Sequence, residues 1–573
     1  MQIRKERSEK EASETYDQEA FNFSFKDRGL ANEILPEEQV YTAEYNWTAT
    51  RYAGVFIYIM CLVLRWKFYK LIQGHFGRAY KIFPIFLLMV AKNIRSIEQL
   101  KNVSSKEAGI LIGMERLGSL PKIWELFYAA SAKNISKKVL KDFFSNQIRS
   151  GFVSTWLWAS DGHALPYTGH CKTRYTYNTQ RKMPIKGQTN IVTCDEQGRI
   201  VDFAIQEGKG DLKSVILELS QKWKEELPAQ PVMVFDREGY STEYFYKLTQ
   251  AQIYFVTWDK YCNKQKLDNI DAANYTQSFN FNGKEYQVYE EVKALTVTIE
   301  KEEITFKLRH VYLWNKSSDK RVCAYAFVSP KITVQDCAKI ILSRFCASEN
   351  TFKHLADRHP LHYHPGFSMQ ESKNQEISNP EIKIKDKDIK KLAIEIQKIE
   401  KKLANLPENK NKNGSERKNN PKAALQQTLS DKQEQLKQTK DIKKDLPVKV
   451  DAAALSDYDS IKTIDNEGKY LFDFITTSVW NARKQMVSWL KDFYDEENNL
   501  VDLFYAISHC QGWIKSTKKE VRVRLEPIQQ PKRRAAQEQF CRKLNSLLPR
   551  SPTGKYFVIE VGENPLQNVQ KKD

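Results

Sequence analysis

The sequence contains no CxxC pair, and this absence argues against the common zinc-binding and disulfide frameworks. Its nine cysteines are scattered, at positions 61, 171, 194, 262, 323, 337, 346, 510 and 541. Neither a zinc ribbon nor a disulfide scaffold is indicated by such spacing. A reducing compartment fits these cysteines best, so we expect a cytoplasmic protein.

The sequence also gives no indication of a membrane span. The uncharged run from Tyr52 to Leu64 holds thirteen residues before Arg65, whereas about twenty are needed to cross a bilayer. We interpret this run as a buried helix. The first residues, Met1 to Arg7, are charged rather than apolar and carry no secretory signal. We therefore expect no membrane partner.

Acidic residues are in the minority. Lysine and arginine total 90 against 71 aspartates and glutamates, which gives a net charge of +19 over 573 residues. Such an excess suits a polyanionic partner, because each neutralised phosphate releases counterions. A generally basic soluble protein is the alternative. The length allows two to four domains with sizeable cores.

The stretch from Val232 to Ser241 predicts a strand that ends at an aspartate, and the later predictions start from it. Four apolar residues, Val232 to Phe235, follow a proline and end at Asp236, and Ser241 then begins a helical pattern. A short apolar run of this kind predicts a strand buried on both faces, with Asp236 at its C-terminal end. Open α/β sheets place their chemistry at that end. The alternative is that Asp236 merely caps the following helix.

A second strand ending in an aspartate precedes it, from Thr155 to Asp161. The segments between the two aspartates predict a hairpin, around 195–198, and then a helix with Asp211 as its N-cap. A strand at 253–258 follows Asp236. The order strand, hairpin, helix, strand, helix, strand is that of the ribonuclease H fold. In that fold the first strand lies beside the strand after the first helix, so we expect Asp161 and Asp236 to be neighbours.

A third acid is predicted on a later helix. Residues 261–328 alternate apolar and polar side chains, which indicates a β insertion. A helical pattern then resumes at Val334, and Glu349 falls between Phe345 and Phe352 on its apolar stripe. A carboxylate on a packed face is costly unless it is paired or bound to a ligand. Three convergent carboxylates suit two Mg²⁺ ions in a phosphoryl-transfer site.

Three segments resemble the acidic motifs of bacterial insertion-sequence DDE transposases, which belong to the retroviral-integrase superfamily. The segments are WASDGHALPYTGH, VFDREGYS followed by IYFVTWDK, and SRFCASENTFKHLADRH. The resemblance covers about 155–365. It implies that Asp161, Asp236 and Glu349 are the catalytic, metal-binding acids, and that two Mg²⁺ ions, replaceable by Mn²⁺, are the cofactors. It also implies double-stranded DNA as the partner, as element ends and as target, a homodimer on paired ends, and a nucleoid-associated location.

The sequence departs from the related transposases on the last helix. These often carry an arginine four residues before the glutamate and a lysine seven after it, but Phe345 and Ala356 occupy those places here. Arg344 and Lys353 are close enough in sequence to be candidates for contacts with the DNA backbone. The full set of expected DNA-binding residues is Lys172, Arg174, Arg181, Lys182, Lys186, Arg237, Arg344 and Lys353.

Histidines raise two further hypotheses. His163, two residues after Asp161, could contact DNA, orient a metal ligand or serve a structural role. The second hypothesis concerns a cluster of four histidines, which could bind zinc although their spacing matches no common zinc pattern. The cluster comprises His354, His359, His362 and His364.

The predicted fold class is α/β, a ribonuclease H-like mixed sheet with flanking helices. The pattern from Lys106 to Phe127 predicts two helices joined by a turn, with Ser119 as the N-cap of the second. This pair is either a DNA-binding helix-turn-helix or part of an ordinary helical bundle. Heptad spacing after Lys383 predicts an antiparallel helical hairpin. The expected regions are a polar arm, 1–45; a helical, DNA-binding domain, 46–150; the catalytic domain, 151–260 and 329–366; the β insertion, 261–328; the charged hairpin, 367–450; and a helical and small α/β region, 451–573.

The transposase hypothesis has two alternatives. A metal-dependent nuclease would hydrolyse DNA without strand transfer. A catalytically decayed transposase would bind DNA as a basic protein without cutting it.

Overall fold

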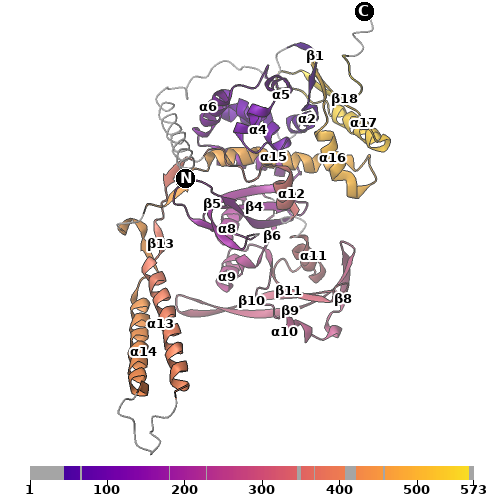
Figure 1. Ribbon diagram of the computed structural model, residues 1–573. Coiled ribbons are helices and arrows are strands. Elements are labelled where there is room, and N and C mark those ends of the chain that lie inside the picture. The colour runs from indigo at the N-terminus through magenta and orange to yellow at the C-terminus, as the bar shows by residue number, and fades with distance from the viewer. Residues whose placement is uncertain are drawn as a thin grey trace, which may run out of the picture. The chain divides into compact units, whose positions relative to one another are not determined.

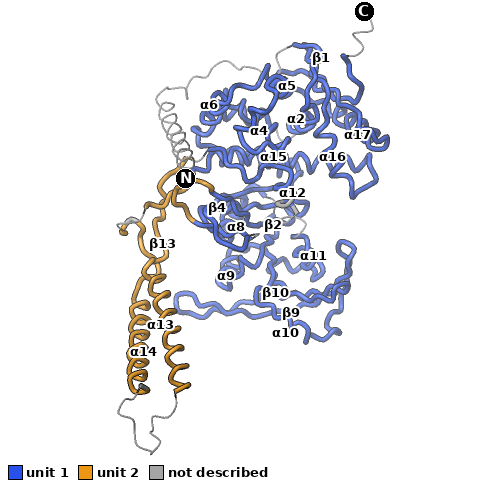
Figure 2. The backbone as a smooth tube through the Cα atoms, viewed as in Figure 1, with its two compact units in different colours: residues 1–167, 175–367, 465–573 blue, residues 168–174, 368–464 orange. Residues whose placement is uncertain are grey.

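The computed structural model describes residues 44–64, 68–179, 181–227, 229–344, 350–366, 368–406, 421–455 and 459–566. The chain forms two compact units (Figure 2): Met1–Tyr167, Tyr175–Phe367 and Asp465–Asp573 make up the first, and Thr168–Arg174 with Ser368–Ile464 the second. The predicted polar arm lies almost wholly outside the described residues, and so does Glu349.

The helical character predicted after Tyr52 is confirmed. The helices are α2 (Phe56–Leu64), α3 (Phe68–Phe76), α4 (Ile82–Ala91), α5 (Ser105–Leu111), α6 (Leu120–Ser131) and α7 (Ser136–Arg149). Every residue of α4 is buried, as a helix that is apolar on all sides must be. The run from Tyr52 to Leu64 forms the buried helix α2, as predicted, and no helix of the described residues is long and apolar enough to cross a membrane.

The segment Lys106 to Phe127 does form two helices joined by a turn, α5 and α6. The connection covers residues 112–119, and it is longer than the three or four residues typical of a DNA-reading helix-turn-helix. Ser119 is the N-cap of α6, although its side chain makes no capping hydrogen bond. The two-helix pattern is therefore confirmed, and DNA reading by α6 stays a prediction.

A mixed sheet forms the centre of the first unit (Figure 1). Five of its strands, β2 (Leu157–Pro166), β4 (Met183–Asp195), β5 (Ile200–Glu207), β6 (Val232–Phe235) and β7 (Phe255–Trp258), run in the order β5, β4, β2, β6, β7. β2, β6 and β7 are parallel, whereas β4 is antiparallel to both β2 and β5. The predicted hairpin is the β4–β5 turn, and the predicted adjacency of β2 and β6 is confirmed.

The central strands β6 and β7 and the first half of β2 are buried on both faces, to which successive side chains point in turn. On β2, Trp158 packs into the larger apolar core, which includes residues of α8 (Leu212–Trp223) and α9 (Thr242–Gln250). Leu157 and Ala159 pack on the other face with α11 (Val334–Arg344). Helices thus cover both faces, and the sheet holds its C-terminal strand ends rigidly.

The N-cap of α8 offers a measurement with a matched control. The carboxylate of Asp211 accepts a hydrogen bond from the backbone N–H of Lys213 at 3.1 Å, whereas Ser119 caps α6 without such a bond. We expect Asp211→Ala to lower the free energy of unfolding by about 1 kcal/mol. Ser119→Ala should cost a few tenths of a kcal/mol at most. Urea denaturation of both variants tests this, and equal losses would contradict it.

The antiparallel strands predicted for the β insertion, residues 261–328, are confirmed. Its strands β8 (Gln277–Phe281), β9 (Lys284–Ile299), β10 (Glu302–Asn315) and β11 (Lys320–Phe327) extend the same sheet, since β11 pairs antiparallel with β7. A short helix, α10 (Lys264–Asp268), precedes them. With β3 (Tyr175–Asn178) beside β4, the sheet has ten strands. Pairing along the free edge of β7 removes an exposed edge.

The helix predicted from Val334 to Leu355 is described as two helices. α11 ends at Arg344 and α12 begins at Asn350 and runs to Arg358. Residues 345–349 between them lie outside the described residues. Ile341 and Leu355 are both fully buried, so the predicted apolar stripe is confirmed at these two positions.

The N-terminal and C-terminal regions were predicted to be separate, but they share one core. α15 (Glu467–Leu490) is buried along most of its length and packs against α2, α4, α6 and α7 as well as β5 (Figure 1). The strand β1 (Tyr45–Thr50), predicted as part of a helical domain, pairs with β16 (Gly512–Ser516). The four-stranded sheet and α15 thus join the two regions in one core.

The remaining C-terminal elements confirm the predicted strand–helix–strand unit. β17 (Glu520–Leu525), α17 (Pro531–Ser546) and β18 (Tyr556–Val561) follow α16 (Leu500–Ser508), and β17 and β18 are parallel. Together with β1 and β16 they form a four-stranded sheet.

The second unit contains the predicted helical hairpin. α13 (Pro380–Ala404) and α14 (Pro421–Asp445) contact each other along their lengths (Figure 1). Its base holds two short strand pairs, β12 (Met369–Glu371) with β15 (Lys462–Ile464), and β13 (Glu376–Ser378) with β14 (Lys449–Asp451). The heptad positions Ile389, Leu392, Ile396, Ile399, Leu403 and Leu406 are all buried or half-buried. The predicted tip, residues 411–420, lies outside the described residues.

Candidate active site

The two predicted aspartates meet at the same edge of the sheet. β2 and β6 run parallel and in register, with Ser160 opposite Phe235, so the residue that follows each of these is an aspartate. β2 continues beyond Asp161 along β4, whereas β6 ends immediately before Asp236. Asp161 therefore lies within a strand rather than at its tip, and Asp236 is at a strand end as predicted.

Each carboxylate is held by the backbone in the same way. Oδ1 of Asp161 accepts a hydrogen bond from the N–H of Gly162 at 2.8 Å, and Oδ1 of Asp236 accepts one from the N–H of Arg237 at 2.6 Å. Such bonds to charged acceptors are short and fix the carboxylate rotamer. The second oxygen of each group, Oδ2, then faces a common neighbour, Arg344.

Arg344 links the two aspartates. Its Nη1 lies 3.6 Å from Oδ2 of Asp161, and its Nη2 lies 3.8 Å from Oδ2 of Asp236. The arginine side chain is 4% exposed, against 25% and 39% for the two aspartates. One buried guanidinium thus spans both carboxylates, at distances that give charge pairing without close hydrogen bonds.

The guanidinium of Arg344, predicted to contact the DNA backbone, is buried against Asp161 and Asp236, and its contact with DNA stays a prediction. A signal for this placement was present in the sequence. Arg344 follows Ile340 and Ile341 by four and three residues, the spacing of one helix face. Both isoleucines are buried, so an arginine at that position also points inward.

The charge of the three groups favours a further cation. Two carboxylates carry two negative charges and the guanidinium one positive charge, which leaves a net negative charge at a partly buried position. Aspartate oxygens are ligands that Mg²⁺ accepts, usually together with water and substrate phosphate. Asp161 and Asp236 therefore fit the predicted metal in type, orientation and charge.

The third predicted acid, Glu349, lies outside the described residues, and its role stays a prediction. The helix that follows it is described: Thr351 of α12 is buried, and its hydroxyl contacts the carbonyl of Gly198 in the β4–β5 turn at 3.4 Å. Lys353 lies on α12 as well. The elements on either side of Glu349 are therefore anchored, α11 through Arg344 at the two aspartates and α12 at the β4–β5 turn.

The other basic residues predicted to bind DNA are divided between the two units. Arg237, beside Asp236, is exposed and adjoins the acidic pair. Arg181 and Lys182 are exposed near the β3–β4 turn, and Lys186 is half-buried on β4. The remaining two, Lys172 and Arg174, belong to the second unit, where the Arg174 guanidinium donates to the carbonyl of Asn374 at 2.6 Å.

His163 has a histidine as its neighbour. It lies two residues beyond Asp161 on β2, hence on the same face of the strand, and its Nε2 is 3.3 Å from Nδ1 of His362. Burial, together with the nearby His362 and Lys469, lowers the pKa of His163 to about 3. His163 is therefore neutral at physiological pH, and its ring adds no positive charge for a DNA phosphate.

The histidine cluster after α12 does not converge on one point. Nδ1 of His359 faces the carbonyl of Val90 at 2.9 Å, and Nδ1 of His364 faces the carbonyl of Gly366 at 2.6 Å. Burial lowers the pKa of both imidazoles to about 4. His362 is turned to His163, so the described contacts serve packing and do not support the zinc alternative here.

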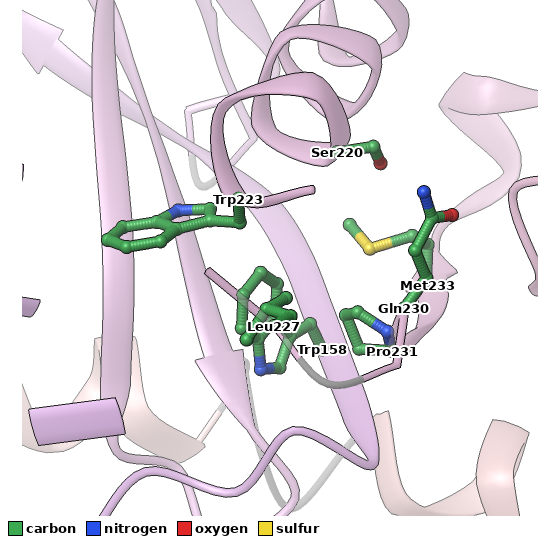
Figure 3. A pocket seen from close by; sticks show the side chains of 7 residues that line it. All are labelled: Trp158, Ser220, Trp223, Leu227, Gln230, Pro231 and Met233. Carbon is green, nitrogen blue, oxygen red and sulfur yellow. The ribbon is translucent and has the colours of Figure 1, made fainter. Parts of the chain in front are cut away.

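A small pocket lies away from the aspartates, at the start of β6 (Figure 3). Its wall is mostly aromatic and aliphatic, and the carboxylates predicted to be catalytic do not contribute to it. The lining residues are Trp158, Ser220, Trp223, Leu227, Gln230, Pro231 and Met233. We assign the pocket to packing of α8 against the sheet.

Comparison with known proteins does not assign the chain. No protein-family model matches it, and no curated protein matches it significantly in sequence.

Proposed function

We propose that this chain is a DDE transposase that cuts DNA at the ends of an insertion sequence and joins them to target DNA. The observation that carries the proposal is the pairing of Asp161 and Asp236 on adjacent parallel strands, each with Oδ2 turned to the same cation. The proposal is supported by the strand order, because β2 lies beside β6, the strand after the first helix, as in a ribonuclease H-like domain.

In this proposal Asp161 and Asp236 hold the metal through oxygens whose orientation the backbone N–H groups of Gly162 and Arg237 fix. Glu349 is the third ligand implied by the resemblance. When bound, two Mg²⁺ ions supply charge stabilisation for the attacking and leaving oxygens of an in-line phosphoryl displacement. The exposed Arg237 beside Asp236 is placed to contact a DNA phosphate at the edge of the site.

Arg344 has a defined part in the same scheme. Its buried guanidinium neutralises one of the two negative charges, which keeps the aspartates in place without metal. It also competes with a metal ion for the Oδ2 atoms. Binding of Mg²⁺ therefore requires the arginine to yield at least part of its contact with them.

The same ion triad is the observation that favours a second candidate, a decayed transposase that binds DNA without cutting it. In that case Arg344 permanently takes the place of the metal. The resulting protein would be a basic DNA-binding protein with a structural Asp–Arg–Asp cluster.

The proposal is tested with labelled DNA that carries the sequences flanking the coding region, where inverted repeats are expected. The full chain is incubated with this DNA and a target plasmid, in Mg²⁺ or in EDTA. We expect cutting and joined products in Mg²⁺ and neither in EDTA. Metal-dependent cutting without joined product would indicate a nuclease, and binding without cutting would indicate the decayed protein.

A further inference from the structure

A second group of ligating side chains lies in the extended part of the sheet. Asp259 follows β7, Cys262 lies three residues later, His310 is on β10 and Cys323 is on β11. They converge because β11 pairs with β7 on one side and with β10 on the other. The N–H of Asp259 donates to the carbonyl of Cys323 at 2.9 Å, which fixes this register.

Asp259, His310 and Cys323 offer ligand atoms within 4.8 Å of one another, and Cys262 adjoins them through Cys323. Nε2 of His310 lies 3.2 Å from Oδ2 of Asp259, and Sγ of Cys323 lies 3.8 Å from the same oxygen. Sγ of Cys262 is 2.7 Å from Sγ of Cys323. Asp259, His310 and Cys323 are each at most 5% exposed, and Cys262 is half-buried, so water screens this group weakly.

The hydrogen bonds around His310 orient its imidazole ring. The hydroxyl of Tyr312 donates to the Oε1 of Glu291 at 2.5 Å. Because a phenol has one proton, its oxygen can then only accept from Nδ1 of His310, at 2.7 Å. Nε2 of His310 faces the carboxylate of Asp259 at 3.2 Å, where an imidazolium would donate to it and a metal ion would be bound by both groups.

The two cysteines indicate which cation. Their Sγ atoms are 2.7 Å apart, and a divalent ion binds cysteines as thiolates, with release of their protons. Two sulfurs, one imidazole nitrogen and one carboxylate oxygen form the four-ligand donor set that suits Zn²⁺ in structural sites.

We propose that Asp259, Cys262, His310 and Cys323 bind a structural Zn²⁺ ion that fastens β10 and β11 to the end of β7. Tyr312 and Glu291 orient the imidazole, the outer-shell arrangement common in zinc sites. The proposal does not depend on the transposase assignment, since it needs neither DNA nor catalysis. The site borders the candidate active site, because Tyr261 packs on Tyr240 of the segment after Asp236, with ring centroids 5.1 Å apart.

The test is the zinc content of the full chain, expressed without a metal-affinity tag and purified under reducing conditions without chelator. Plasma emission spectroscopy should find about one zinc per chain. Cys262→Ser, Cys323→Ser and His310→Gln should lose it. Cys510→Ser should keep it, as a control in which a half-buried thiol far from the group is removed. Cobalt substitution should give thiolate-to-metal absorption in wild type and weaken it in Cys262→Ser.

Two features keep the test decisive if a buried variant misfolds. Cys262 is half-buried, and Glu291 is exposed, with its Oε1 3.7 Å from Nδ1 of His310 and hydrogen-bonded to Tyr312, so we expect changes at both positions to leave the fold intact. Glu291→Gln should weaken zinc retention about tenfold to a hundredfold in a chelator competition. Folded wild type without zinc would overturn the proposal, and a Cys262–Cys323 disulfide in the purified protein would identify a redox pair instead. Equal zinc in all variants would also overturn it.

Discussion

Replacement of Asp161 or Asp236 by asparagine is expected to abolish Mg²⁺-dependent cutting of element-end DNA, with a loss of roughly 10³-fold or more. Asparagine keeps the Oδ1 acceptor that the N–H of Gly162 or Arg237 binds, so the local backbone should persist. What it removes is the negative charge at Oδ2, on which metal binding depends. Gel-shift affinity for the same DNA should be unchanged or slightly tighter, since one repulsive charge is lost.

The control for these variants is Asp211→Asn. Asp211 is exposed, and its carboxylate caps α8, a role that asparagine fills equally well. This variant carries the same chemical change on the same sheet domain, so it should cut like wild type. Full activity of Asp236→Asn would contradict the proposed function. Normal cutting by Glu349→Gln, with both aspartates essential, would show that the third ligand lies elsewhere.

Local patterns predicted most of the central elements. The burial of Leu212, Val215, Ile216, Leu219 and Trp223 on α8 follows the helical spacing in the sequence, and the strand at β6 follows from four apolar residues after a proline. The neighbouring places of Asp161 and Asp236 required the fold as a whole. They were predictable because the order of elements suggested a known arrangement of strands.

The features that sequence reasoning missed depend on contacts between distant parts of the chain. The strand β1 finds its partner β16 more than four hundred residues later, and no local periodicity specifies that pairing. β11 likewise joins β7 by its edge, which makes the insertion part of the sheet. The zinc donor set escaped notice for the same reason: its cysteines are 61 residues apart, and spacing rules detect ligands that are close in sequence.

Substitution of Arg344 should change both the free energy of unfolding and the binding of Mg²⁺, each by a large amount. Arg344→Met removes the guanidinium but retains the apolar stem, and it leaves two carboxylates facing each other. Loss of one partner from a buried ion cluster costs about 3–5 kcal/mol. Because Asp161 and Asp236 are partly exposed, water offsets some of this, and we expect a decrease of about 3 kcal/mol in the free energy of unfolding.

Added Mg²⁺ should return part of that loss, because the ion binds the folded pair and not the unfolded chain. At a concentration a hundred times the dissociation constant the gain is about 2.7 kcal/mol. Wild type should gain less, since its arginine competes for the same oxygens.

The control is Arg358→Met, which removes an exposed partner of Asp502 at 3.8 Å. This variant should cost about 1 kcal/mol or less, with no response to Mg²⁺ beyond that of wild type. Urea denaturation of wild type, Arg344→Met and Arg358→Met, with and without Mg²⁺, distinguishes a metal-binding site from a permanent Asp161–Arg344–Asp236 cluster. A loss in Arg344→Met that Mg²⁺ does not reduce would mean that the aspartates hold an arginine and no metal, as in the decayed protein.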